Sequence, residues 1–210
     1  MRIERRDSPA DRARKLASDI AQAAMASGVE GRVCGPSCTF VCSRCGATAC
    51  QCDCSPDCVH APRTLSPEPD QYPIEPGIMP LVFEIKRLGL FTPCWSCEGH
   101  LRPDRSLWKL PSVWFYCDSL VHVRLLSQGL SHLRAARALS APWHVAVTFS
   151  DPDNPETTFA LEPSRSGDGE LSLPALQKDA GVIARALNKM MNDEARTLQR
   201  EAGKILERSR

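Results

Sequence analysis

Cysteine carries the clearest chemical signal in this sequence. The chain of 210 residues contains eleven cysteines, and eight of them lie between positions 34 and 58. Thiolates suit zinc, which takes four cysteine or histidine ligands at about 2.0 to 2.3 Å. The segment also has too little apolar side chain to fold by burial alone. The spacing therefore predicts a metal-binding module with the ligands Cys34, Cys38, Cys42, Cys45, Cys50, Cys52, Cys54 and Cys58.

The identity of the metal in this module is open between zinc and iron. Eight thiolates can hold two tetrahedral zinc ions, or one cluster in which some thiolates bridge. Four cysteines also bind iron–sulfur clusters. The spacing Cys38-x3-Cys42-x2-Cys45 is similar to that of radical S-adenosylmethionine enzymes, which usually carry an aromatic residue where this chain has Arg44. We expect zinc as the cofactor, with an iron–sulfur cluster as the alternative.

A second group of reactive side chains lies in the segment Cys94-Trp-Ser-Cys97-Glu-Gly-His100. Cys117 ends a predicted strand that could pair with this segment and bring its thiol alongside. Three cysteines and one histidine would complete a zinc site. If one of them points away, an open position would bind water, with Glu98 as general base. The predicted ligands are Cys94, Cys97, His100 and Cys117, and the predicted catalytic residues are Glu98 and His100.

Other interpretations of this second group stay open. Cys94 and Cys97 could form a redox dithiol, although such pairs are usually activated at a helix N-terminus. They could also combine with Cys42 and Cys45 as the two halves of a split zinc ribbon. Cys97 could act as a nucleophile with His100 as its base. The simplest alternative is a sharply turned loop with partly buried thiols and a surface histidine.

The tract Ser96-Cys-Glu-Gly-His100 resembles uncharacterised bacterial proteins that carry Ser-Cys-x-Gly-His after a helix and a short strand. The resemblance extends from about Pro80 to Pro163, and it implies a site without naming a reaction. The tract is also similar, more faintly, to the Ser-Cys-Ser-Gly-Arg motif of the wybutosine-synthesis methyltransferase family. Glu98 and His100 stand here in place of that family's second serine and its arginine.

The elements that must position these residues follow from hydrophobic period and end signals. A capped helix is expected near the N-terminus, starting at Ser8. Residues 78–88 have helical spacing, and Gly89 stands where a left-handed cap belongs. The remaining predicted elements are a short strand at 90–92, a strand at 113–117, a helix at 119–139, a hairpin of 143–149 with 157–161, and a helix at 174–207.

This order predicts an α+β fold, a small and mostly antiparallel sheet covered by helices. An N-terminal helix and the cysteine-rich, metal-stapled module precede it. Six prolines between positions 62 and 80 prevent regular structure and predict an extended connector. The expected units are the N-terminal helix (1–30), the cysteine-rich module (31–60), the proline-rich connector (61–77) and the α+β domain (78–210).

Charge and hydropathy bear on location and partners. The formal net charge of +1 gives no whole-chain attraction to polyanions, so nucleic-acid binding is possible but not indicated. The longest apolar runs fall far short of a membrane span, and no secretory h-region follows Met1, so we expect a cytoplasmic protein without membrane contact. The expected partners are an unknown protein or a small anionic ligand, for which Arg102, Arg105 and Lys109 are candidates.

These observations predict a cytosolic, zinc-binding protein that acts as a binding or assembly module through its metal sites. The alternative is a metal-dependent hydrolase or nucleic-acid-modifying enzyme with its site at Cys97, Glu98 and His100. The second alternative is an iron–sulfur protein. An open coordination position beside a pocket would favour the enzyme, whereas a closed shell of four ligands would favour the binding protein.

Overall fold

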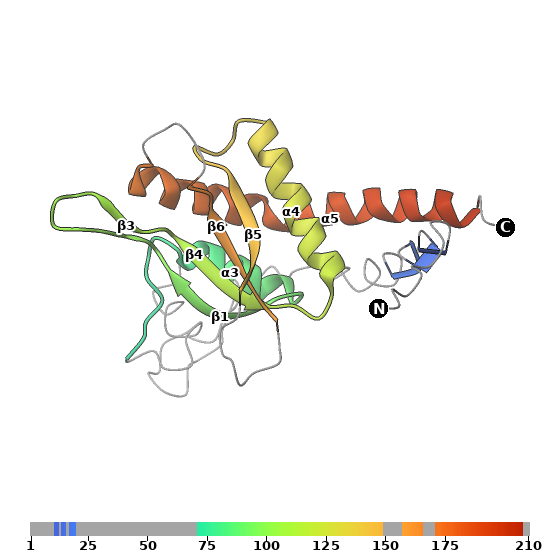
Figure 1. Ribbon diagram of the computed structural model, residues 1–210, viewed down its shortest axis with the longest axis horizontal. Coiled ribbons are helices and arrows are strands. Elements are labelled where there is room, and N and C mark those ends of the chain that lie inside the picture. Colours follow the sequence, from blue (N-terminus) through green and yellow to red (C-terminus); the bar gives the residue numbers. More distant parts are fainter. Residues whose placement is uncertain are drawn as a thin grey trace, which may run out of the picture.

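The computed structural model describes residues 11–12, 14–15, 17–19, 71–148, 157–165 and 171–207. Their architecture is α+β, one antiparallel sheet of four strands with helices on one face (Figure 1), as the sequence predicts. The cysteine-rich module and most of the proline-rich connector lie outside the described residues. In chain order the elements are α3 (Met79–Leu88), β1 (Thr92–Cys97), β2 (His100–Leu101), β3 (Leu107–Lys109), β4 (Ser112–Tyr116), α4 (Leu120–Ala135), β5 (Trp143–Thr148), β6 (Thr158–Pro163) and α5 (Leu173–Glu207).

Helix α3 leads into the first strand and begins beside a proline, which tolerates the first helical turn because it needs no hydrogen-bond donor there. It ends at Gly89, whose φ of 67° and N–H bond to Lys86 form a left-handed cap, as the sequence predicts. Five apolar residues of the helix are buried: Leu81, Val82, Phe83, Ile85 and Leu88. The helix therefore fixes where the chain enters β1.

The main sheet has the strand order β1-β4-β6-β5, and all its neighbouring strands are antiparallel. Strand β1 is longer than expected and later in the chain, since it runs to Cys97 rather than ending at Thr92. Both of its cysteines therefore lie on a strand at the edge of the sheet and not on a polar loop. The segment after Gly99, expected to be a loop, forms the small hairpin of β2 and β3.

A β-bulge sets the faces of strand β1. Pro93 lies opposite Phe115, Trp95 lies opposite Trp114, and Cys94 between them is the extra residue. A bulge shifts the alternation of side chains by one position, so every residue after it changes face. Phe115 belongs to the core under the helices, whereas Trp95 and the later Cys97 share the opposite face of the sheet.

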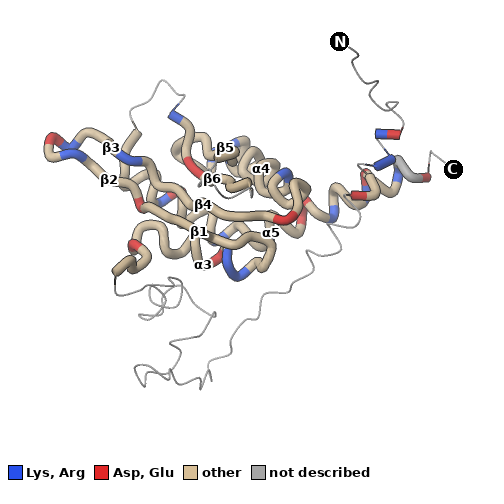
Figure 2. Tube along the Cα trace, turned by 60° about the horizontal axis from the view of Figure 1, so that its bottom comes forward, with Lys and Arg blue, Asp and Glu red and all other residues tan. Residues whose placement is uncertain are grey.

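The helices cover the other face of the sheet. Helix α5 packs against both α3 and α4, and its last turns extend past the sheet, where the described residues 11–19 lie beside it (Figures 1 and 2). One core cluster joins residues of all these layers, among them Ala17, Leu81, Phe115, Leu125, Phe159 and Ile183. Within the described residues, no helix combines the length and the apolar character needed to cross a bilayer.

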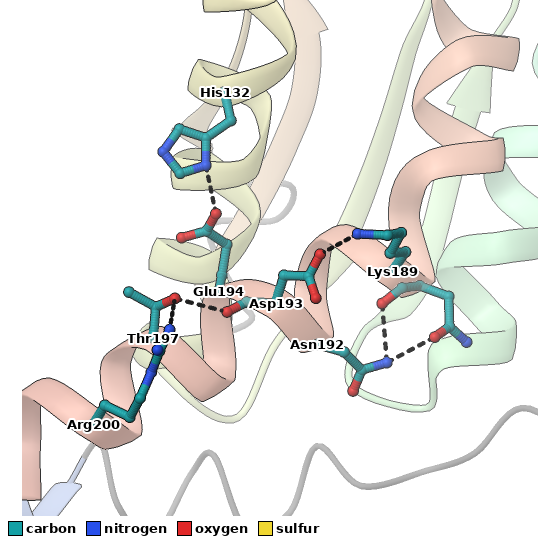
Figure 3. A network of polar contacts seen from close by, with 8 residues as sticks. His132, Lys189, Asn192, Asp193, Glu194, Thr197 and Arg200 are labelled. Carbon is teal, nitrogen blue, oxygen red and sulfur yellow. Dashed lines mark hydrogen bonds and ion pairs between the residues drawn. The ribbon is translucent and has the colours of Figure 1, made fainter.

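Polar side chains of α5 form contacts within the helix and one contact with α4. Figure 3 shows His132 of α4 reaching Glu194 of α5, with 2.6 Å between Nδ1 and Oε1. Lys189 pairs with Asp193 one turn further along, and Asn192 donates to the carbonyl of Asn188 at 3.0 Å. The first pair joins an exposed imidazole to the buried carboxylate of Glu194, whereas Lys189 and Asp193 form an exposed pair of the kind that contributes little to stability. The histidine is therefore an interhelical contact residue.

The crossing of α4 and α5 predicts opposite effects of two glycine substitutions. A Cβ on Gly129 would lie 2.2 Å from Cγ of Met190, whereas a Cβ on Gly203 would meet nothing within 4 Å. We expect Gly129→Ala to lower the free energy of unfolding by about 1 to 3 kcal/mol through overpacking. Gly203→Ala should raise it by about 0.5 to 1 kcal/mol, because alanine favours helix. Thermal melts of the two variants check this, and equal melting temperatures would contradict the close crossing.

Candidate metal centre

Three side chains with metal-binding atoms meet at the end of strand β1. One oxygen of Glu75, the sulfur of Cys97 and one nitrogen of His100 all lie within 4.8 Å of one another. Cys97 is 3% exposed, while the other two side chains are partly exposed. Donors of a tetrahedral zinc site with bonds of about 2.0 to 2.3 Å stand about 3.3 to 3.8 Å apart. The group is therefore close to the spacing that a single ion requires.

Glu75 holds the imidazole of His100. Its Oε1 lies 3.3 Å from Nε2 of His100, and its Oε2 accepts a bond from the N–H of Glu98 at 2.7 Å. The carbonyl of the same residue accepts bonds from the N–H groups of Ile78 and Met79 at the start of α3. The backbone and the side chain of Glu75 are therefore both fixed by hydrogen bonds. This leaves Oε1 of the carboxylate directed toward His100.

A tight turn of Glu98 and Gly99 separates Cys97 from His100. Gly99 has a φ of 86°, which side-chain-bearing residues rarely adopt, and its N–H points to the sulfur of Cys97 at 3.4 Å. Gln177 of α5 donates to the carbonyl of Glu98 at 3.2 Å. The contact with α5 therefore fixes the turn, and the turn brings the thiol of Cys97 close to the imidazole of His100.

The surroundings of the Cys97 thiol disfavour a free thiolate. Burial raises its pKa, the N–H of Gly99 lowers it, and the carboxylates of Glu75 and Glu98 raise it further, against a lowering effect of Lys109. A nucleophilic cysteine needs the opposite, a lowered pKa beside a cation or a helix N-terminus. A bound metal ion displaces the thiol proton and so favours the thiolate over the protonated thiol. The charges around Cys97 therefore suit a metal ligand better than a nucleophile.

Cys94 and Cys117 do not join this group, although the sequence predicts all four residues as ligands of one site. Cys94 occupies the bulge of β1. Cys117 follows the end of β4 that lies opposite Thr92, whereas Cys97 is opposite Ser112 at the other end. Its thiol donates to the carbonyl of Ser119 at 3.2 Å. The two strands do pair, but their antiparallel register separates the thiols by the length of the strand.

Glu98, predicted as a general base, uses one carboxylate oxygen in a backbone contact. Its Oε2 accepts the N–H of Gly77 at 2.7 Å, and a Cβ on Gly77 would come within 2.8 Å of that oxygen. The carboxylate therefore clamps the turn to the segment before α3. Glu75, which the sequence analysis did not single out, supplies the carboxylate beside His100 instead. It lies 22 residues before Cys97 among prolines, and no spacing rule connects the two.

A pocket of about 670 Å³ lies against the three donor groups. The edge strand β1 forms one wall, from Pro93 to Cys97, and the segment 71–75 forms another. His100 and Lys109 of the β2–β3 hairpin complete the side nearest the donors. Such a volume is in the range of small-molecule and substrate sites. An ion held by the three groups would thus face a space large enough for a substrate.

The outcome for the sequence-predicted ligands is therefore mixed. The structure brings Cys97 and His100 together and adds Glu75. The eight cysteines from Cys34 to Cys58 lie outside the described residues. Comparison of the chain with protein-family models, with curated proteins and with solved structures finds no match. The likeness of the Ser96–His100 tract to uncharacterised bacterial proteins stays a resemblance.

Proposed function

We propose that the protein is a metal-dependent hydrolase whose centre is a single divalent ion, best zinc, bound by Glu75, Cys97 and His100. The observation that carries the proposal is the convergence of these three donors at the wall of a large pocket. Sulfur, imidazole and carboxylate together form a donor set typical of zinc. Three protein ligands leave a fourth position for water, which is the arrangement of catalytic rather than structural zinc.

The roles of the surrounding residues follow from their contacts. Bound zinc lowers the pKa of its water to about 7 and so supplies hydroxide near neutral pH. Glu75 and His100 would both bind the ion, since their Oε1 and Nε2 atoms lie 3.3 Å apart, and Glu98 fixes the turn that joins Cys97 to His100. The ammonium of Lys109, which lines the pocket, would stabilise negative charge developing on the substrate. In the proposed hydrolysis, the bond between the electrophilic centre and the leaving group would break, the water oxygen would join that centre, and a water proton would go to the leaving group.

The sequence alone favoured a non-catalytic binding or assembly role through the cysteine-rich module. That role rests on residues outside the described part of the chain. The geometry at β1 supports the enzyme alternative because, among the described residues, three donor groups and not four converge beside a pocket. Hydrolysis is therefore the function that the described residues support best. The proposed ligands are Glu75, Cys97 and His100, and not the expected set with Cys94 and Cys117.

Cobalt titration of the full-length protein tests the proposal. The cysteine-rich module is expected to bind metal too, so the readout is the difference between variants. We expect Glu75→Gln, Cys97→Ser and His100→Ala each to lose one equivalent of tightly bound cobalt. The matched control Cys117→Ser should keep it, because that thiol lies at the other end of β4. Equal stoichiometry in all variants would overturn the proposal.

The same samples test whether the fourth position is open. The wild-type minus His100→Ala difference spectrum isolates the cobalt ion of this site. Azide should shift the visible bands of that spectrum if water occupies the fourth position, since an external ligand can replace it. A difference spectrum that azide leaves unchanged would indicate a closed, structural site and would contradict the hydrolase assignment while keeping the metal.

A further inference from the structure

Large aromatic side chains are exposed around the pocket. Tyr72, Trp95 and Trp108 are 68%, 47% and 51% exposed, and they form what we call the aromatic rim. Tyr72 and Trp95 line the pocket, and the ring of Trp108 lies 6.5 Å from that of His100. Among the described residues, these are the only exposed large aromatic side chains. Exposed rings gathered at one site indicate a surface that is covered when a ligand binds.

Positive charge accompanies the aromatic rim. Lys109 places its Nζ 4.8 Å from the ring centre of Trp108, and it lines the pocket. Arg102 and Arg105 are exposed on the turn between β2 and β3, which projects from the sheet (Figure 2). Arg165 donates to the carbonyl of Trp108 at 3.3 Å. Four cationic side chains are thus placed on or beside one hairpin.

Within the described part of the chain, these cations form no ion pair with an acidic side chain. The nearest carboxylate in sequence, Asp104, is bound by the N–H of Ser106 at 2.9 Å and by its hydroxyl at 2.6 Å. The hairpin is therefore a local positive surface, although the net charge of the chain is only +1. Its charge is complementary to a polyanion.

We propose that single-stranded nucleic acid is the substrate class of this pocket. Bases would stack on Trp95 and Trp108, and the phosphates would contact Lys109 and the arginines of the hairpin. Stacking platforms combined with a basic groove are the physical basis of single-strand binding, since every unpaired base offers an aromatic face. The inference rests on the proposed hydrolytic centre for its chemistry, because the stacked strand would pass beside the donor group.

The other ligand that the site suggests is an extended peptide added to the edge of β1. The bulge at Cys94 and the proline at position 93 interrupt that edge, because proline has no N–H and a bulge breaks the ladder. Binding of an extended peptide would also not explain why cationic side chains lie beside exposed tryptophan rings. The observations therefore favour nucleic acid, and peptide binding becomes an outcome of the test.

Fluorescence anisotropy of a labelled twelve-residue oligothymidylate with the full-length protein tests the inference. Trp108→Ala should weaken binding about 5- to 150-fold, the loss expected for one stacked base. Lys109→Ala should weaken it and reduce the slope of log affinity against log salt by about 0.7, the value for one phosphate contact to a single strand. A duplex of equal length should bind at least about tenfold more weakly, because its bases are not free to stack.

Two exposed positions on α4 provide controls. Leu120→Ala removes an exposed apolar side chain and Arg124→Ala an exposed charge, both away from the hairpin, and both should bind like wild type. Binding unchanged within twofold in Trp108→Ala and Lys109→Ala would overturn the inference, even if the chain binds the oligonucleotide elsewhere. Equal competition by an oligoglutamate of matched charge, or tighter binding of a neutral extended peptide, would overturn it as well.

The failure of this inference can be distinguished from failure of the metal centre. Trp108 and Lys109 are not among the metal-binding atoms. Cys97→Ser should lose the metal equivalent and keep oligonucleotide binding within a few-fold of wild type. If Cys97→Ser keeps all its metal, the proposed centre fails while the effects of Trp108→Ala and Lys109→Ala still decide the nucleic-acid surface.

Discussion

Replacing Asp179 by alanine is expected to lower the free energy of unfolding by about 3 kcal/mol or more. Asp179 is 3% exposed on α5, and its carboxylate accepts bonds from Ser140, Ala141 and Trp143. The donors are two backbone N–H groups, one hydroxyl and the indole N–H. Alanine would leave these donors without their charged acceptor in a buried place, and such groups are costly to leave unpaired.

The expected result is a fall in melting temperature of roughly 10 °C, measured by circular dichroism. Asp179→Asn should show a smaller fall, because an amide oxygen can accept part of the same bonds. Asp193→Ala on the same helix is the matched control, since that side chain is exposed and pairs with Lys189 at the surface. A similar melting temperature for the Asp179 and Asp193 variants would show that the bonds around Asp179 contribute little.

Gly99→Ala is expected to be the most damaging single substitution in the candidate metal centre. A Cβ there would lie 2.6 Å from Leu173 and 3.0 Å from the backbone oxygen of Lys109, and the φ of 86° is strained for alanine. The turn must therefore move, and with it the relative positions of Cys97 and His100. We expect a loss of stability of about 3 kcal/mol and loss of the metal equivalent assigned to this site.

Gly89→Ala separates backbone strain from displacement of the site. Gly89 has a similar φ of 67°, but a Cβ there would meet nothing within 4 Å. Its replacement should cost about 1 kcal/mol and leave metal content unchanged. The two variants are compared by thermal melts and by metal analysis of the same samples. Full metal content in Gly99→Ala would contradict the role given to the turn.

Local sequence patterns predict much of the fold. The helical spacing before Gly89 and the glycine itself gave α3 with its cap, since both signals depend on neighbouring residues only. Ser119 caps α4 by accepting from Val121, again as expected. The alternation after Trp143 gave β5, and the apolar period of the last segment gave α5. Helix α4 ends at Ala135, earlier than position 139, because the backbone turns at Arg137, whose φ is 54°, while the N–H of Ala138 bonds back to the carbonyl of Leu133.

Local sequence patterns predicted only part of the candidate site. Cys97 and His100 could be recognised because one short turn joins them. Three further features could not be recognised from sequence. The bulge at Cys94 decides which face of β1 carries Cys97, and the register against β4 takes Cys117 away from it. Glu75 reaches the site from 22 residues earlier.

The sequence by itself determined the α+β class, the helices α3, α4 and α5, the strands β4, β5 and β6, and the thiol and imidazole as candidate donors. Each of these follows from residue type and from contacts within a few positions along the chain. The tertiary structure alone decided that Glu75, Cys97 and His100 converge, that Trp95 lines the pocket beside them, and that Trp108 lies next to His100. Strand register and the packing of α3 and α5 set those positions, because long-range pairing depends on the free energy of the whole fold and not on any local spacing.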